Sequence, residues 1–132
     1  MNNQDQPVSE FKSKSGLKRI FSALSYSLEG FKSAWRGEHS FRQEVLLVVV
    51  ATIIALCLPV SALERLMLIG VLVLVLIVEL LNSAVEAVVD RVSLERNPLS
   101  KNAKDFGSAA VLLTLLLAAA TWIVITLPLF SH

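Results

Sequence analysis

Three long apolar runs dominate the chain from Val45 onward and constrain what it can fold into. Val45–Val60 and Ser108–Phe130 carry no charged residue, and Leu66–Val89 carries only Glu79 and Glu86. A helix needs roughly 20 apolar residues to cross a hydrocarbon layer about 30 Å thick. The pattern therefore predicts an all-α membrane protein with three transmembrane helices. We expect them at about 43–62, 66–89 and 108–130.

Composition supports a membrane protein and excludes some functions. Of the 132 residues 55% are hydrophobic and only 17% are charged, whereas soluble domains carry about 25% charged residues. The net charge of +1, from 12 Lys and Arg against 11 Asp and Glu, excludes a strongly basic nucleic-acid binder. No internal repeat or low-complexity linker divides the chain, so residues 1–132 are predicted to form a single domain.

The basic residues predict how the helices are oriented in the membrane. Lys and Arg are frequent before the first span and in the link 90–107 but nearly absent from the link 61–65, where Arg65 stands alone, and from the C-terminus. Cytoplasmic loops of membrane proteins are enriched in Lys and Arg. We therefore expect the N-terminus and the link 90–107 in the cytoplasm and the C-terminus outside it.

The segment 16–36 has a helical pattern of its own. Its apolar side chains recur at spacings of three and four residues, as in one stripe of an α-helix. Such an amphipathic helix can lie in the membrane interface, and the polar segment 1–15 before it is expected to be a flexible tail. The stripe consists of Leu17, Ile20, Phe21, Leu24, Leu28, Phe31 and Trp35.

Polar side chains form a stripe on the second span. Glu79, Asn82, Ser83, Glu86 and Asp90 are spaced to share one helix face, and Glu79 lies about 16 Å along the axis from Asp90. Asn and Ser can simply join helices in membranes. Buried carboxylates are costly and repel each other, so a cation between the two glutamates, Mg²⁺ by its preference for oxygen, would explain the pair.

The link before the third span carries chemistry that would complement such a site. Lys101, Lys104 and Asp105 precede Ser108, where the third span is predicted to begin. A lysine beside a helix N-terminus suits a phosphate group, although Lys104 could serve only as a cytoplasmic orientation charge. Glu38 and Glu44, before the first span, are expected as lone charges to be solvated. No G-x-G-x-x-G or Walker A motif is present.

Three blocks of residues resemble the small integral-membrane diacylglycerol kinases of Gram-negative bacteria. They are Glu38–Glu44 (EHSFRQE), Val78–Arg91 (VELLNSAVEAVVDR) and Ala103–Val111 (AKDFGSAAV). The resemblance runs from about Gly16 to Trp122. It implies a homotrimer in the bacterial inner membrane, with active sites shared between neighbouring subunits at the cytoplasmic surface. It also implies transfer of the γ-phosphate of ATP to diacylglycerol, giving phosphatidic acid, with Mg²⁺ as cofactor.

The resemblance also implies roles for individual residues. Glu79 matches the catalytic base, Asn82 a supporting residue, and Glu38 and Glu86 the metal-bearing carboxylates, which also contact ATP. The other nucleotide contacts would be Arg19, Tyr26, Glu95, Arg96, Asn97, Lys104 and Asp105. The lipid-binding residues would be Lys32, Ser33, Ala34, Trp35, Ser40, Phe41, Arg42, Gln43, Glu44 and Ser108, together with Arg19 and Glu79.

The chain departs from the family pattern in two places. Leu28 replaces an expected aromatic residue, and Glu95–Pro98 is a divergent form of the segment before the AKD block. The second departure concerns the predicted nucleotide contacts directly.

Other functions compete with this interpretation. Relatives from Gram-positive bacteria phosphorylate undecaprenol, but the FRQE sequence ending at Glu44 resembles the diacylglycerol enzymes. A lone glutamate such as Glu79 is typical of proton or ion pathways, but Leu66–Val78 is apolar, so the polar stripe opens at one end only. A non-catalytic assembly subunit would leave the two membrane glutamates unexplained.

Overall fold

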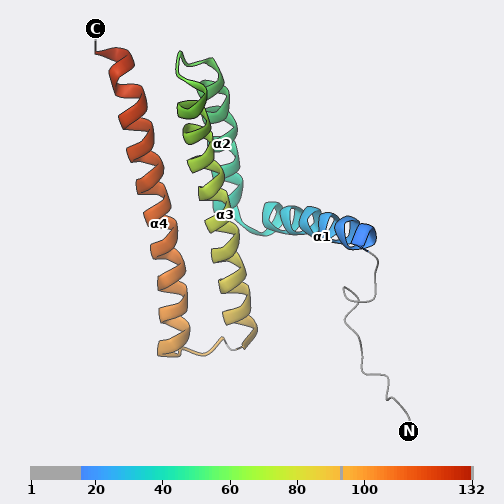
Figure 1. Cartoon of the computed structure of the whole chain (residues 1–132). Coiled ribbons are helices and arrows are strands. Elements are labelled where there is room, and N and C mark those ends of the chain that lie inside the picture. Colours follow the sequence, from blue (N-terminus) through green and yellow to red (C-terminus); the bar gives the residue numbers. More distant parts are fainter. Residues whose placement is uncertain (1–15, 93, 132) are drawn as a thin grey trace. The chain divides into compact units, whose positions relative to one another are not determined.

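The computed structural model describes residues 16–92 and 94–131, and this part of the chain is helical without a strand. Four α-helices follow one another along the chain, and a short 3₁₀-helix, η1, closes it at Leu127–Phe130 (Figure 1). The predicted tail, 1–15, lies outside the described residues. The helices are α1 (Gly16–Gly37), α2 (His39–Cys57), α3 (Ala62–Val92) and α4 (Pro98–Thr126).

Three of these helices are long and apolar enough to cross a membrane. They are α2, α3 and the segment from α4 through η1. The prediction of an all-α protein with three transmembrane spans is therefore confirmed in its architecture. The chain divides into two compact units, one ending at Gly37 and one beginning at Glu38.

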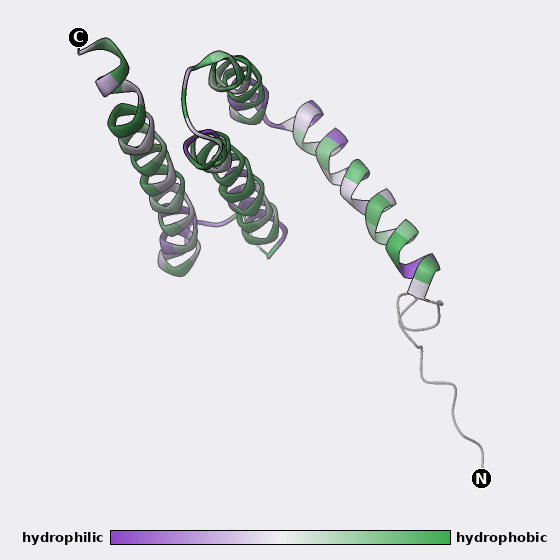
Figure 2. Cartoon of the chain, turned by 45° about the horizontal axis from the view of Figure 1, so that its top comes forward, coloured by the Kyte–Doolittle hydropathy of each residue, from purple (hydrophilic) through white to green (hydrophobic). Residues whose placement is uncertain are grey.

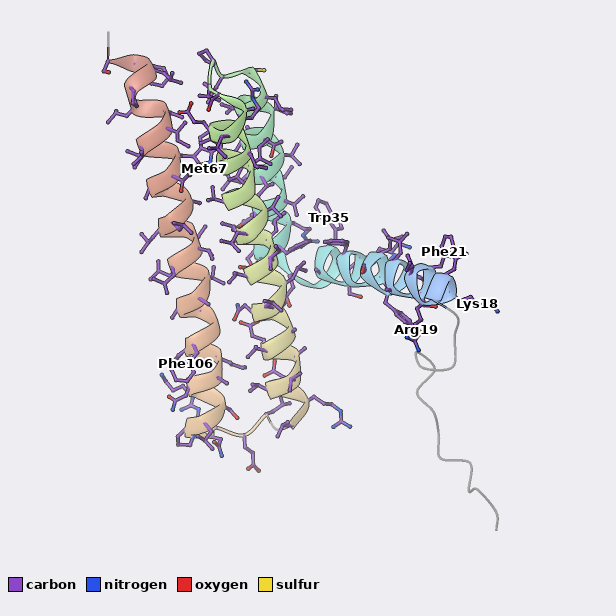
Figure 3. All side chains as sticks on the ribbon, viewed as in Figure 1. Lys18, Arg19, Phe21, Trp35, Met67 and Phe106 are labelled. Carbon is purple, nitrogen blue, oxygen red and sulfur yellow. The ribbon has the colours of Figure 1, made fainter. Side chains whose placement is uncertain are left out.

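The unit that ends at Gly37 contains α1, whose apolar stripe is exposed. Phe21 is 63% exposed and Trp35 45% exposed. Both point to one side of the helix, whereas Arg19 points to the other (Figure 3). An exposed apolar stripe opposite basic side chains is the arrangement of a helix that lies in a membrane interface, which supports the prediction for this segment.

The second unit is a bundle in which α3 packs against both α2 and α4. The turn between α2 and α3 lies at one end of the bundle together with the C-terminus, and the link between α3 and α4 lies at the other end (Figure 1). Apolar residues cover most of the three helices, and hydrophilic residues are prominent at the link between α3 and α4 (Figure 2). This arrangement is the one that the predicted topology requires, while the direction of insertion stays a prediction.

The turn between α2 and α3 is held by Arg65. Its guanidinium group donates hydrogen bonds to three backbone carbonyl oxygens, those of Ala55 (3.1 Å), Leu58 (3.0 Å) and Val60 (3.5 Å). Carbonyl groups at a helix C-terminus lack partners within the helix, and Arg65 supplies them. Because Pro59 has no N–H to continue the helix, α2 ends at Cys57, before the apolar run ends.

A small apolar core lies at the same end of the bundle. Ala55, Leu68 and Ile125, one from each helix, are buried together, and Trp122 packs against them. The indole N–H of Trp122 donates to the carbonyl oxygen of Leu68 at 3.2 Å. This bond ties α4 to α3 far from the polar stripe.

α4 begins at Pro98, ten residues before the predicted start of the third span at Ser108. The carboxamide oxygen of Asn97 accepts a hydrogen bond from the backbone N–H of Leu99 at 2.8 Å, and Pro98 occupies the first helical position. Both are strong helix-start features. The prediction that Lys104 lies beside a helix N-terminus is therefore wrong, because Lys104 and Asp105 lie in the second turn of α4.

Candidate active site

Glu79 is the one buried charged side chain among the described residues, with only 5% of its surface exposed. It lies on α3, within the bundle. The hydroxyl group of Ser40, in the first turn of α2, donates a hydrogen bond of 2.9 Å to its Oε1 atom. A carboxylate in an apolar surrounding needs such a donor to offset its lost hydration. The start of α2 thus supplies a hydrogen-bond partner for the deepest carboxylate of the polar stripe.

Glu44, also on α2, lies near enough to Glu79 for the two carboxyl groups to interact. Its Oε2 atom is buried without a hydrogen-bond partner. The expectation that Glu44 is solvated is therefore wrong, because α2 packs on α3 and turns this side chain inward. Two carboxyl groups in such contact repel each other unless they share a proton.

Asn82 connects the stripe to α4. Its amide nitrogen donates to Oε1 of Glu86 at 3.5 Å, while its amide oxygen is buried without a partner. That oxygen lies against Gly107 of α4, where a methyl group would overlap it. Gly107 therefore lets α4 approach the polar stripe, a role that the sequence analysis did not assign to it.

An open pocket of about 680 Å³ lies where α3 and α4 meet their link. The ammonium group of Lys104 forms an ion pair of 2.7 Å with Asp90 of α3, and Lys101 pairs with Asp105 at 2.6 Å. Asp90 was predicted only as the end of the polar stripe, and its contact with Lys104 across two helices has no signal in the sequence. The residues that line the pocket include Asp90, Glu95, Arg96, Asn97, Lys101 and Lys104.

The predicted nucleotide contacts between Glu95 and Asp105 therefore do not all face the pocket in the same way. Glu95, Arg96 and Lys104 line this pocket. Asn97 lines it too, but its carboxamide oxygen is engaged in capping α4. The exposed side chain of Asp105 pairs with Lys101 on the same helix.

The predicted metal ligands Glu38 and Glu86 are both half-buried. Glu38 precedes α2 at its N-cap position, yet its side chain makes no capping hydrogen bond. Glu86 is in contact with Asn82, whose amide oxygen lacks a partner. Oxygen donors of this kind suit Mg²⁺, so the donor chemistry fits a magnesium ion. Within 16–92 and 94–131 no three His, Cys, Asp or Glu side chains gather as a metal-binding group.

The remaining candidate residues are distributed over both units. Arg19, Tyr26 and the segment Lys32–Trp35 lie on α1, in the unit that ends at Gly37. In the bundle unit Phe41 is 3% exposed, so its ring is a packing residue, whereas Arg42 is half-buried and Gln43 is exposed. Ser108 follows Gly107 on α4 and is exposed.

These features define a multi-pass membrane protein with a glutamate buried between its helices and a pocket lined by basic side chains at one end of its bundle. Comparison with known proteins gives its family. Residues 25–126 match the family described as prokaryotic diacylglycerol kinase. The chain therefore belongs to the prokaryotic diacylglycerol kinase family, which confirms the resemblance found in its sequence.

Individual relatives agree with this assignment over nearly their whole length. The diacylglycerol kinase of Pseudomonas aeruginosa is 60% identical over 119 residues, which are 90% of this chain and 97% of the relative. That of Escherichia coli K12 is 49% identical over 117 residues, 89% of this chain and 93% of the relative. That of Haemophilus influenzae is 41% identical over 107 residues, 81% and 91% of the two chains.

Proposed function

We propose that this protein transfers the γ-phosphate of ATP to the free hydroxyl of diacylglycerol, giving phosphatidic acid and ADP, with Glu79 as the general base. Its family membership and its close relatives make it a diacylglycerol kinase, an ATP-dependent lipid kinase of the membrane. The observation that carries the assignment of the base is the burial of Glu79, with its Oε1 held by Ser40.

In the proposed step the lipid hydroxyl oxygen forms a bond to the γ-phosphorus atom. The bond between this phosphorus and the oxygen that bridges to the β-phosphate breaks, and ADP leaves with that oxygen. The hydroxyl proton passes to the carboxylate of Glu79. Phosphoryl transfer depends mainly on positioning and charge stabilisation, and a general base contributes a further 10²- to 10⁴-fold, in order of magnitude.

The pocket at the link between α3 and α4 is the proposed nucleotide site. Lys104, held by Asp90 at 2.7 Å, would place a positive charge on the phosphate groups, and Arg96 would add a second. Glu38 and Glu86 are the proposed ligands of Mg²⁺, which when bound would neutralise phosphate oxygens. The orphaned amide oxygen of Asn82, whose amide nitrogen bonds to Glu86, supports the proposal as a further oxygen donor near this carboxylate.

An apolar groove supports a lipid as the acceptor. It has a volume of about 330 Å³ and is lined by side chains of α2, α3 and α4, from Glu44 to Trp122. Its other lining residues are apolar, among them Ala51, Val75 and Ala118. Because Glu44 faces Glu79, an acyl chain in this groove would bring the lipid headgroup to the proposed base.

The assembly and orientation are part of the same proposal. We infer a homotrimer with active sites shared between subunits in the bacterial inner membrane, with the N-terminus in the cytoplasm and the C-terminus in the periplasm. The abundance of Lys and Arg before α2 and in the link between α3 and α4 supports the orientation. The exposed apolar side chains along α2, α3 and α4 give the helices surface for contact with lipid or with further subunits.

The test uses the purified full chain in detergent or in bilayers, with ATP, Mg²⁺ and diacylglycerol or undecaprenol. We expect transfer to diacylglycerol with a clear preference over undecaprenol. Glu79→Gln should reduce kcat by about 10³-fold, because it removes the proton acceptor. Glu64→Gln is the matched control on the same helix, since glutamine can still bond to Ser61 at the helix start. A preference for undecaprenol, or a wild-type rate for Glu79→Gln, contradicts the proposal.

A further inference from the structure

We propose that Ser40 is a positioning residue for Glu79, which it orients through the hydrogen bond from its hydroxyl group to Oε1. The inference rests on the proposed function of Glu79 as the base. It gives Ser40 a role other than the lipid contact that the family resemblance implies. The hydroxyl has a single proton to donate, and in the structure that proton is directed to Glu79 at 2.9 Å.

The backbone of Ser40 is fixed on both sides. The carbonyl oxygen of Glu38 accepts a hydrogen bond from the N–H of Arg42 at 3.3 Å, which closes the first turn of α2 around Ser40. The neighbouring Phe41 is 3% exposed and anchors the turn by packing. A short side chain on a fixed turn loses little rotational freedom when it forms a bond, so Ser40 can hold one carboxylate oxygen in a defined direction.

The bond also distinguishes Glu79 from Glu44. The two carboxyl groups face each other, and the hydroxyl of Ser40 reaches Oε1 of Glu79, whereas Oε2 of Glu44 is buried without a partner. A donated hydrogen bond stabilises an ionised carboxylate. Ser40 therefore favours Glu79, rather than the neighbouring Glu44, as the carboxylate that accepts the proton of the lipid hydroxyl.

The kinetic test compares Ser40→Ala, Ser40→Thr and the control Ser27→Ala. The hydroxyl of Ser27 bonds within its own helix, to the carbonyl oxygen of Ala23 at 2.8 Å, and Ser27 is not one of the proposed site residues. We expect Ser40→Ala to lower kcat about 10-fold, which corresponds to ~1.4 kcal/mol, while KM for ATP and for diacylglycerol changes less than about twofold. Ser40→Thr keeps the hydroxyl and should recover most of kcat, and Ser27→Ala should leave both constants unchanged.

A second readout does not require turnover. In infrared difference spectra of the full-length protein, the carboxylate band that Glu79→Gln removes should shift in Ser40→Ala and return in Ser40→Thr. An unshifted band shows that Ser40 does not bond to Glu79 and overturns the inference. A raised KM for diacylglycerol at unchanged kcat also overturns it, because that result assigns Ser40 to lipid binding.

The two proposals can fail separately. If Glu79→Gln abolishes transfer while Ser40→Ala retains the wild-type kcat and band position, only the role of Ser40 is refuted. If the wild-type protein transfers no phosphate but Ser40→Ala shifts the Glu79 band, the contact stands and its catalytic meaning is refuted together with the proposed function.

Discussion

Replacing Gly107 by alanine should disturb the proposed site more than its size suggests. Gly107 is the point at which α4 contacts Asn82 of α3, and an added Cβ atom would overlap the amide oxygen of Asn82. It would also stand 3.1 Å from Cγ of the same side chain. Rotating the amide plane moves the oxygen but leaves Cγ in place. Even then Cγ must give way by a few tenths of an ångström, so the side chain of Asn82 or α4 itself must shift.

The structure sets the scale of the cost. Overpacking of a tight helix contact by one methyl group costs about 1–3 kcal/mol. A displaced Asn82 also loses its hydrogen bond to Glu86, which at 3.5 Å is long and weak. Against this, alanine gains up to about 1 kcal/mol over glycine within a helix. Gly70 of α3 has open space where its Cβ would stand, so Gly70→Ala measures that gain alone.

The assay is an unfolding titration in mixed micelles, followed by tryptophan fluorescence, with kcat measured on the same samples. We expect Gly107→Ala to be less stable than Gly70→Ala by about 1–3 kcal/mol. Its kcat should fall as well, because Asn82 no longer supports Glu86. Gly70→Ala should retain wild-type kcat.

A double variant tests the cause. Asn82→Ala removes the atoms that the new methyl group meets, so adding Gly107→Ala to it should cost no further stability, a non-additivity expected of contacting residues. Equal stability of Gly107→Ala and Gly70→Ala would refute the reasoning. Strictly additive costs in the double variant would place the clash elsewhere.

Two further predictions concern the ends of the bundle. Arg65→Ala should lower the free energy of unfolding by about 2–3 kcal/mol, because three carbonyl groups lose a charged donor. The kcat of this variant should stay at the wild-type value. An unchanged unfolding midpoint contradicts the role of Arg65. Lys104→Met should raise KM for ATP about 10-fold through loss of a phosphate contact, while KM for diacylglycerol stays nearly constant. Steady-state kinetics with each substrate varied in turn measures both constants. A change confined to KM for diacylglycerol argues against a role of Lys104 in nucleotide binding.

The membrane architecture could be predicted because it follows from local sequence. The lengths of the apolar runs, which carry Glu79 and Glu86 as their only charges, fix three spans. The helical spacing of Glu79, Asn82 and Glu86 fixes their common face. α4 starts at Pro98, before its apolar run, because Asn97 and Pro98 are helix-start signals, whereas the apolar run shows only which part of the helix can lie in the hydrocarbon layer.

The site could be predicted only where its residues share one helix or match the family. Glu79 and Glu86 both lie on α3, and their spacing along the chain predicts that they share one helix face. Glu44 was expected to be solvated because nothing in its neighbourhood along the chain shows that α2 will turn it toward Glu79. The pairing of Asp90 with Lys104 was missed for the same reason, since it joins two helices.

The sequence by itself determined that this chain lies in a membrane, that its middle span carries carboxylates, and which family it resembles. Hydrophobic length and helical periodicity are properties of neighbouring residues, so they can be read along the chain. Tertiary structure decided which groups meet: Ser40 and Glu44 at Glu79, Gly107 at Asn82. Those contacts depend on how the helices pack against one another, because packing sets the distance between side chains that the sequence places far apart.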